Sequence, residues 1–489
     1  MQTTENLIPI ESDVNQYINK NKAVLDNDIV DLFKKFKIKS LLSSASIKKR
    51  TGHSTNEIVF SLFFIPFLML STVFLFVRTQ YDNANANKNR YYRMLENANY
   101  NWRSFILNLS LRVSQSMREK TEKSNSVNEK STTEYSEFFV VDDTITTVSG
   151  KLVESASYIY DHVTGKSVLG FQKLVLGMFN GSHFIPISNN ICVGKKKPNA
   201  KSKAKKYKKI PKSEKIQPDS PGALERDMLD QTKLERTVSM LKQALKKGFK
   251  APTVLFDSWF CFNSFIINIV ESLEIDVICQ LKNLPRTNKY LYCGKAYSLK
   301  ELFAYFAKPR LRMIKKHRLK RSVIIVDLPQ SKVKLKIVFI QNEGKDKWHA
   351  FAATDISLSA VKILDYYSQR WSIEVFFKSS KQHLNFGKEQ MSNLDSIIAC
   401  DALVFMRYIL LTYLAFRDES SFYNKFDAIR KIHTINTFGM RLLKYFFNRL
   451  DYLIQEIREL ISDGFIEEGL KLLQNLSDIQ NEPIQLGTV

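Results

Sequence analysis

Cysteine and histidine are scarce in this chain of 489 residues, and neither type is grouped. The five cysteines are odd in number, far apart and form no C-x-x-C pair, which excludes a disulfide framework and gives no sign of a structural zinc site. With only 16 glycines and 12 prolines, the chain is neither collagen-like nor of low complexity. These absences fit a protein of a reducing cytoplasm. The histidines that lack metal-ligand spacing are His162, His183, His317, His349 and His383.

A secretory signal is also missing, and there is one long hydrophobic run. The first residues, MQTTENLIPIESDVN, hold no basic segment followed by an apolar stretch, so we expect no signal peptide. The run Ile58–Val77 is long enough to cross a membrane, and it would equally suit a helix buried in a large protein. Because Pro66 interrupts it and a long basic stretch follows it, we favour the buried helix and expect no membrane partner.

Positive charge is what the chain has in excess. Lys and Arg number 73 against 49 Asp and Glu, a formal net charge of +24. Such an excess indicates a polyanionic partner, most often nucleic acid, although a merely basic cytosolic enzyme is the alternative. With 44% hydrophobic and 12% aromatic residues, the chain can fill real cores, which excludes global disorder.

The apolar patterns predict helices at both ends and a mixed α/β region between them. Two basic segments stand out, Lys195–Lys215 with eleven lysines and one acid, and Lys308–Arg321. We expect Asp395–Phe416 to pack on the core, and the acidic, amphipathic Tyr452–Leu473 to fold back or to join subunits. The predicted strands are 137–141, 166–178, 183–193, 253–256, 276–281, 323–328, 335–341 and 348–353, and the predicted central helices are 223–247 and 261–272.

Three carboxylates occupy positions that strands or helices would present to a ligand. Asp142 ends the apolar run EFFVV, and Asp257 ends the apolar run TVLF. Strand ends of an α/β sheet form the edge where ligands bind, although a single aspartate there is more often a turn former or helix cap. Glu374 lies within YYSQRWSIEVFFKSSKQ, surrounded by large apolar residues.

The segment around Glu374 predicts one helix with a polar face. Tyr367, Arg370, Glu374 and Lys381 are spaced so that they fall within roughly 60° of one another on a helix. The face could be a solvated surface with ion pairs, but the flanking Trp371 and other apolar residues favour a largely buried helix. An acid, an arginine and a lysine on such a face indicate a phosphate-handling site. Cleavage of a DNA phosphodiester needs Mg²⁺ or Mn²⁺, which take carboxylate oxygens as ligands.

At these residues the sequence resembles the bacterial cut-and-paste DDE insertion-sequence transposases that carry the Tyr-Arg-Glu-Lys signature. The signature is Y-x2-R-x3-E-x6-K, and Tyr367, Arg370, Glu374 and Lys381 match every spacing. The D-x-T at 142–144 and the LFDSWF block around Asp257 are similar to the other two motifs of the family.

The resemblance implies an α/β fold: an RNase H-like mixed sheet with flanking helices, a β-rich insertion, and helical N- and C-terminal regions. It implies that Asp142, Asp257 and Glu374 bind the catalytic metals, two ions of Mg²⁺ or Mn²⁺. The expected boundaries are a helical, DNA-binding region at 1–118, the first part of the catalytic core at 135–281 with a basic loop at 195–221, the insertion at 282–354, the rest of the core at 355–416 and a helical region at 417–489.

The same resemblance makes Tyr367, Arg370 and Lys381 contacts to transposon-end DNA, and Trp259 a candidate to hold a flipped base. Core packing at a helix start is an equally good interpretation of Trp259. Two aspartates occupy the first motif; the D-x-T pattern favours Asp142, since Asp143 would point to the opposite face of a strand.

The expected activity is therefore cleavage at the ends of an insertion sequence and joining of the 3′ ends to target DNA. The partners would be double-stranded DNA, as terminal inverted repeats and target, and a second copy of the chain when DNA is bound. We expect a cytoplasmic, nucleoid-associated bacterial protein. A DNA-binding protein or inactive relative without catalysis is the alternative, and a membrane-anchored protein built around Ile58–Val77 is a third.

Overall fold

The computed structural model describes residues 28–49, 51–52, 54–78, 88–127, 137–150, 152–193, 216–314, 319–342, 344, 346–388 and 390–431. Everything below concerns these residues. The lysine-rich segment Lys195–Lys215 and the acidic stretch Tyr452–Leu473 lie outside them, as does part of Lys308–Arg321.

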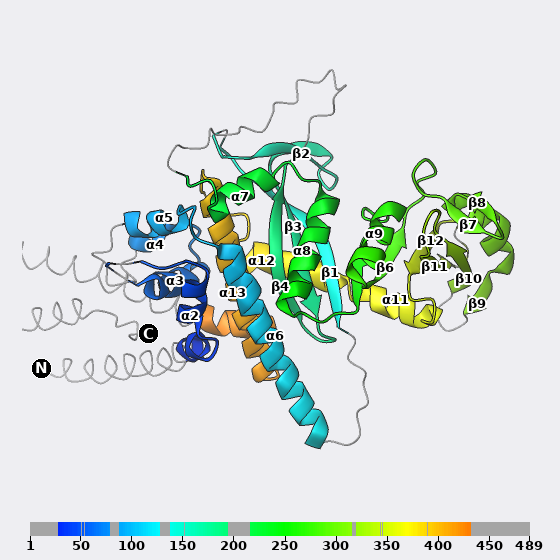
Figure 1. The fold of residues 1–489 in the computed structure, drawn as a ribbon. Helices are drawn as coiled ribbons and strands as arrows, with labels where there is room; N and C mark the ends of the chain where they lie inside the picture. The colour runs from blue at the N-terminus through cyan, green and yellow to red at the C-terminus, as the bar shows by residue number, and fades with distance from the viewer. Residues whose placement is uncertain are drawn as a thin grey trace, which may run out of the picture.

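The secondary structure follows the predicted order of a helical start, a mixed centre and a helical end (Figure 1). The helices are α2 (Ile38–Ser44), α3 (Thr55–Phe63), η1 (Ile65–Leu68), α4 (Val73–Arg78), α5 (Asn89–Leu95), α6 (Trp102–Val127), α7 (Pro221–Met228), α8 (Lys233–Lys247), α9 (Asn263–Leu273), α10 (Leu299–Leu302), η2 (Phe303–Ala307), η3 (Lys308–Arg310), α11 (Ala360–Ser368), α12 (Trp371–His383) and α13 (Leu394–Arg417). The strands are β1 (Phe138–Thr147), β2 (Ser157–Asp161), β3 (Lys166–Phe179), β4 (Phe184–Cys192), β5 (Thr253–Phe256), β6 (Asp276–Leu281), β7 (Tyr290–Tyr292), β8 (Lys295–Tyr297), β9 (Arg312–Ile314), β10 (Leu319–Asp327), β11 (Lys334–Asn342) and β12 (Trp348–Ala353).

One mixed sheet runs through the described part of the chain and confirms the predicted α/β class. Its order is β2-β3-β1-β5-β6-β12-β11-β10-β7-β8, with β4 also paired to β3 and β9 to β10. β1, β5 and β6 are parallel neighbours, whereas β3 is antiparallel to β1. The apolar runs FFVV of β1 and TVLF of β5 suit this central place, because parallel strands are covered on both faces.

Helices cover both faces of the sheet near β1. Phe139 and Val141 belong to the core formed with α8 and α9, whereas Phe138 and Val140 belong to the core formed with α12 and α13. Figure 1 shows α8 in front of the sheet and α12 behind it. Alternate residues of β1 therefore face two different helical layers.

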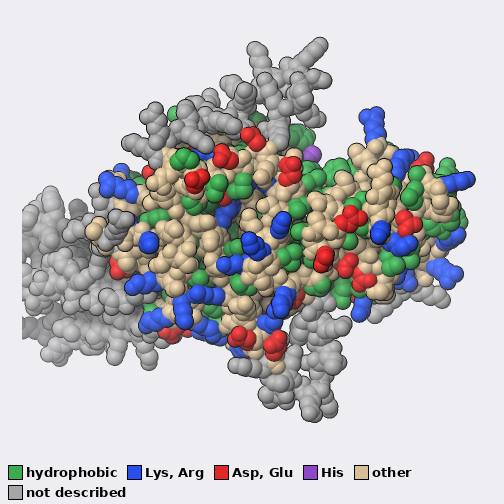
Figure 2. All heavy atoms as spheres, viewed as in Figure 1, with side chains coloured by type: hydrophobic (Ala, Val, Ile, Leu, Met, Phe, Trp, Pro, Cys, Tyr) green, Lys and Arg blue, Asp and Glu red, His purple; other side chains and the backbone are tan. Residues whose placement is uncertain are grey.

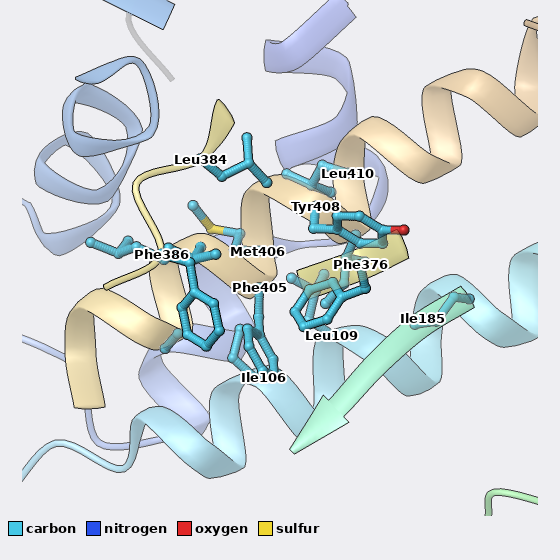
Figure 3. Close-up of a cluster of buried hydrophobic side chains, with 14 of the residues drawn as sticks. Ile106, Leu109, Ile185, Phe376, Leu384, Phe386, Phe405, Met406, Tyr408 and Leu410 are labelled. Carbon is cyan, nitrogen blue, oxygen red and sulfur yellow. The ribbon is translucent and has the colours of Figure 1, made fainter. Parts of the chain in front are cut away.

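The larger core joins the sheet to the helices that follow the signature segment. The ring of Phe376 on α12 lies 5.2 Å from that of Phe405 and 4.8 Å from that of Tyr408, both on α13 (Figure 3). It also lies 5.4 Å from the ring of Phe184 on β4. The prediction that Asp395–Phe416 packs on the core is confirmed. Within the described ranges, α13 is the one helix long and apolar enough to cross a membrane, and 94% of its most apolar window is buried inside the protein.

The hydrophobic run Ile58–Val77 is buried over most of its length but does not form the expected single helix. Ser54 begins α3 with a capping box to Glu57. Pro66 lies in the short 3₁₀ helix η1, and Met69 ends that helix at a φ of 56°. A proline and a left-handed residue do not continue an α-helix, so the run is divided into α3, η1 and α4. Its second part is partly open, since Met69 is 71% exposed.

The β-rich segment expected at 282–354 contains β7 to β12, and these strands extend the central sheet. β12 pairs antiparallel with β6, placing Ala353 opposite Ile278. The sequence missed β2, β7, β8 and β9, all of five residues or fewer. It also joined α7 and α8 into one helix and ended β1 at Val141, whereas that strand continues to Thr147.

Candidate active site

Asp142 and Asp257 lie side by side on neighbouring parallel strands. The β1–β5 pairing places Val141 opposite Phe256; Asp142 is the next residue of β1, and Asp257 directly follows the end of β5. Beyond this point β1 continues along β3 alone, so the two carboxylates lie where β1 loses its parallel neighbour. The fold thus places the first two acids beside each other at the edge of the sheet where ligands bind in α/β proteins.

Arg370 connects this pair to the third acid. Its Nη1 donates to Oδ2 of Asp142 at 2.9 Å, and its Nη2 donates to Oε1 of Glu374. The guanidinium is largely buried, with 14% of the side chain exposed, and its Nε has no hydrogen-bond acceptor. Arg370 therefore joins Asp142 on the sheet to Glu374 on α12.

The signature segment is two helices, not the one helix expected. α11 ends at Ser368 and α12 begins at Trp371, and the amide of Arg370 donates to the carbonyl of Tyr367 in a tighter turn. Trp371 is also 61% exposed, contrary to the prediction of a largely buried helix. The next apolar residue on that side, Val375, is 38% exposed, whereas Ile373 is fully buried.

Burial and mutual repulsion disturb the titration of the two aspartates. Loss of water, together with the nearby charges of Asp257 and Asp143, raises the pKa of Asp142 to about 7, although Arg370 opposes the rise. Burial likewise raises the pKa of Asp257, and the amide of Trp259, which donates to its Oδ1 at 2.8 Å, counteracts this.

Tyr367 and Lys381 extend the site in two directions. The ring of Tyr367 lies 4.8 Å from that of Phe351, and its hydroxyl donates to Gln280 at 3.4 Å. Burial raises the pKa of Tyr367 to about 12. Lys381 Nζ donates to Thr144 Oγ1 at 2.6 Å and to the Ile145 carbonyl at 2.9 Å, so this lysine contacts the D-x-T motif directly.

Asp143 points away from the other acids, as strand alternation predicts. Its carboxylate pairs with Lys233 Nζ of α8 and accepts from Gln172 Nε2 at 2.6 Å. The sequence reasoning missed Lys233, which lies ninety positions along the chain from Asp143. The sequence carried one signal for Lys233: the capping box T-x-x-E at 232–235 places this lysine in the first turn of a helix, where cations are disfavoured.

Trp259 does not pack in the core, since 47% of it is exposed. The centre of its ring lies 3.3 Å from Lys233 Nζ.

The donor set suits a hard divalent cation. Every candidate ligand is a carboxylate oxygen, which Mg²⁺ and Mn²⁺ prefer, and the repulsion between Asp142 and Asp257 is what a cation would relieve. As the side chains stand, with Arg370 between two of the acids, no three carboxylate, imidazole or thiol groups among the described residues are gathered closely enough to bind a metal. A metal would therefore require movement of Arg370 or Glu374.

Two family models match the chain. Residues 78–285 match the DDE superfamily endonuclease, and residues 226–410 match the transposase DDE domain. The first range contains Asp142 and Asp257, and the second contains Asp257 and Glu374. A comparison with curated proteins gave no match. The two matches support a nuclease-type enzyme of the DDE transposase kind.

Proposed function

We propose that this protein is a metal-dependent DNA transposase that cleaves the ends of an insertion sequence and joins the 3′ ends to target DNA. The observation that carries the proposal is the placement of Asp142 beside Asp257, with Arg370 linking Asp142 to Glu374. A protein that only binds DNA has no use for three acids that would repel phosphates. The complete Tyr-Arg-Glu-Lys spacing supports the same proposal.

Asp142, Asp257 and Glu374 would hold the divalent ions. Two such ions would supply an activated water and would stabilise the leaving 3′ oxygen of an in-line displacement. The protein contributes orientation: Asp142 and Asp257 are fixed by their strands, and Glu374 by the first turn of α12. Asp142 and Asp257 are thus held beside each other before DNA binds, which lowers the cost of ordering them, whereas Arg370 or Glu374 must still move.

Arg370, Tyr367 and Lys381 would contact the DNA end. The guanidinium of Arg370 has a donor at Nε that no acceptor uses, and its planar fork suits a phosphate. Lys381 brings a positive charge to Thr144, two residues from Asp142, where it can attract a phosphate as a point charge. Burial and the neighbouring Lys173 lower the pKa of Lys381, and Asp161 opposes them.

The substrate would be double-stranded DNA, bound in part through charge. Figure 2 shows Lys and Arg side chains over both the central region and the β-rich end of the face in view. Two DNA ends must be held together for coordinated cleavage, so we propose a homodimer on DNA. We further propose a cytoplasmic, nucleoid-associated protein of a bacterium.

The test is cleavage of DNA that carries the inverted repeats flanking the coding sequence. Alanine at Asp142, Asp257 or Glu374 should abolish Mg²⁺- or Mn²⁺-dependent cleavage and leave DNA binding nearly unchanged. Asp327→Asn is the matched control, because this carboxylate is 53% exposed and pairs with Lys334 across its own hairpin, away from the three acids. Substantial cleavage by Glu374→Ala would overturn the assignment, and binding without cleavage by the natural protein would favour the non-catalytic alternative.

A further inference from the structure

Lys233 occupies an unusual position for a lysine. It is the first residue of α8, where the partial positive charge of the helix disfavours a cation, and it is 8% exposed. Burial of an ammonium group is costly unless specific partners compensate for the lost water. The neighbours of Lys233 should therefore explain why a lysine stands here.

Three groups surround the ammonium. It pairs with the carboxylate of Asp143 on β1, and it lies 3.3 Å from the ring centre of Trp259 and 5.2 Å from that of Phe260. Gln172 on β3 donates to the other oxygen of Asp143 at 2.6 Å, which fixes that carboxylate. A cation over an indole face is the strongest arrangement of this type.

The indole of Trp259 is therefore held on one side and open on the other. Lys233 covers one ring face, and the rings of Phe260 and Phe262 pack against the indole at interplanar angles of 75° and 86°. The side chain nevertheless remains 47% exposed. Its amide donates to Asp257, so the ring lies two residues from an acid of the candidate site.

We propose that Lys233 is a positioning residue that holds Trp259 beside the acids, with its free ring face ready to stack on an unpaired base of the DNA end. This inference rests on the proposed function. It also explains why two aspartates occupy the first motif: Asp142 serves the acid site on one face of the sheet, and Asp143 anchors Lys233 on the other. The first and second acidic motifs are thus joined through Lys233.

The first test uses the free protein and does not depend on catalysis. Acrylamide quenching of tryptophan fluorescence is measured with Trp259→Phe as the reference that isolates the signal of Trp259. In Lys233→Met, which keeps an apolar stem but loses the ammonium that pairs with Asp143, quenching of Trp259 should increase because the side chain is no longer held over the ring. Lys242→Gln, an exposed position on the same helix, is the control and should match the natural protein. Unchanged quenching in Lys233→Met would overturn the proposal.

The second test asks whether Lys233 acts through Trp259. With 2-aminopurine placed at the cleavage end, Lys233→Met should weaken the stacking signal and lower cleavage by about tenfold, the scale of one base–aromatic stacking interaction. In a Trp259→Ala background, Lys233→Met should cause no further loss, whereas a merely structural role would lower cleavage in both backgrounds. Equal losses in the two backgrounds would contradict the proposal. If the natural protein did not cleave at all, the proposed function would fail while the quenching result still decided the role of Lys233.

Discussion

At the scale of single residues, burial makes a carboxyl group change its protonation near neutral pH. Asp142 has lost most of its water, lies next to Asp257 and has one arginine for compensation. Because its pKa is about 7 in the folded protein and 3.8 in the unfolded chain, Asp142 keeps its proton between these two pH values only when the protein is folded. Ionisation of Asp142 beside Asp257 therefore costs free energy, and a bound divalent ion would remove that cost.

The first prediction follows from this difference in proton binding. Between pH 4 and pH 7 the folded state binds more protons at Asp142 than the unfolded state, so without divalent metal the free energy of unfolding should fall as pH rises, by up to about 4 kcal/mol. Asp142→Asn carries no charge and should lack this part of the pH dependence. Urea unfolding of both proteins in chelator at pH 5 and pH 8 measures it. Parallel pH dependences would show that Asp142 titrates normally.

Sequence alone could place the acids but not their partners. Side-chain alternation separated Asp142 from Asp143, because it is a local property of one strand. The contacts of Lys233 depend on how α8 lies on the sheet, and no local pattern fixes that. The exposure of Trp371 was missed for the same reason, since apolar character does not tell which side of a helix is covered.

At the scale of elements, a buried ion pair ties the sheet to α13. Lys173 on β3 and Asp401 on α13 are fully buried and lie 2.6 Å apart, and Asn189 on β4 donates to the second oxygen of Asp401 at 2.8 Å. Lys173 is the strand neighbour of Thr144, which Lys381 contacts. The buried pair is therefore connected to Lys381 through Thr144.

The second prediction concerns this pair. Lys173→Met alone should destabilise the protein by about 3–5 kcal/mol, because Asp401 would remain buried without the ammonium that pairs with it. Adding Asp401→Leu should recover most of the loss, since apolar residues of similar size can replace a buried pair. Thermal unfolding of the single and double variants gives the comparison. A double variant as unstable as the single one would mean that the pair is required for packing beyond its charge.

The element order was predictable, and so were the ends of the short buried strands, whereas several other element ends were not. Apolar runs of four to six residues located β5 and β6, whose bounds match the prediction. The break between α11 and α12 could not be predicted from the sequence, because Gln369 and Arg370 are good helix formers. The turn between the two helices depends instead on how they pack on the sheet. The short strands of the β-rich segment were missed because strands of three residues carry no readable alternation.

At the scale of the whole molecule, the net charge of +24 predicts how DNA binding depends on salt. Neutralised phosphates release counterions, so affinity should fall steeply as salt rises. Lys308, Arg310 and Arg312 are exposed on the β-rich end and are candidates for phosphate contacts.

The third prediction is therefore a change in slope. Replacing these three residues with glutamine should weaken binding to all sequences about equally and reduce the slope of log affinity against log salt by up to about 0.9 for each phosphate that is no longer neutralised. Lys334→Gln is the control, because Lys334 is already paired with Asp327 at 2.8 Å. An unchanged slope would mean that this cluster is only solvated surface. The same titration on variants of Lys195–Lys215 would examine the other basic segment.

The proposed function depends most directly on binding of the catalytic metal by the neighbouring carboxylates of Asp142 and Asp257. The direct measurement is cleavage of end DNA by Asp257→Cys in Mg²⁺ and in Mn²⁺. A thiolate is a poor ligand for Mg²⁺ but an acceptable one for the softer Mn²⁺. We predict that Asp257→Cys is inactive in Mg²⁺ and regains cleavage in Mn²⁺, whereas Asp257→Ala stays inactive in both. Equal activity of Asp257→Cys in the two metals, or no recovery in Mn²⁺ while DNA binding is intact, would contradict a metal at Asp257.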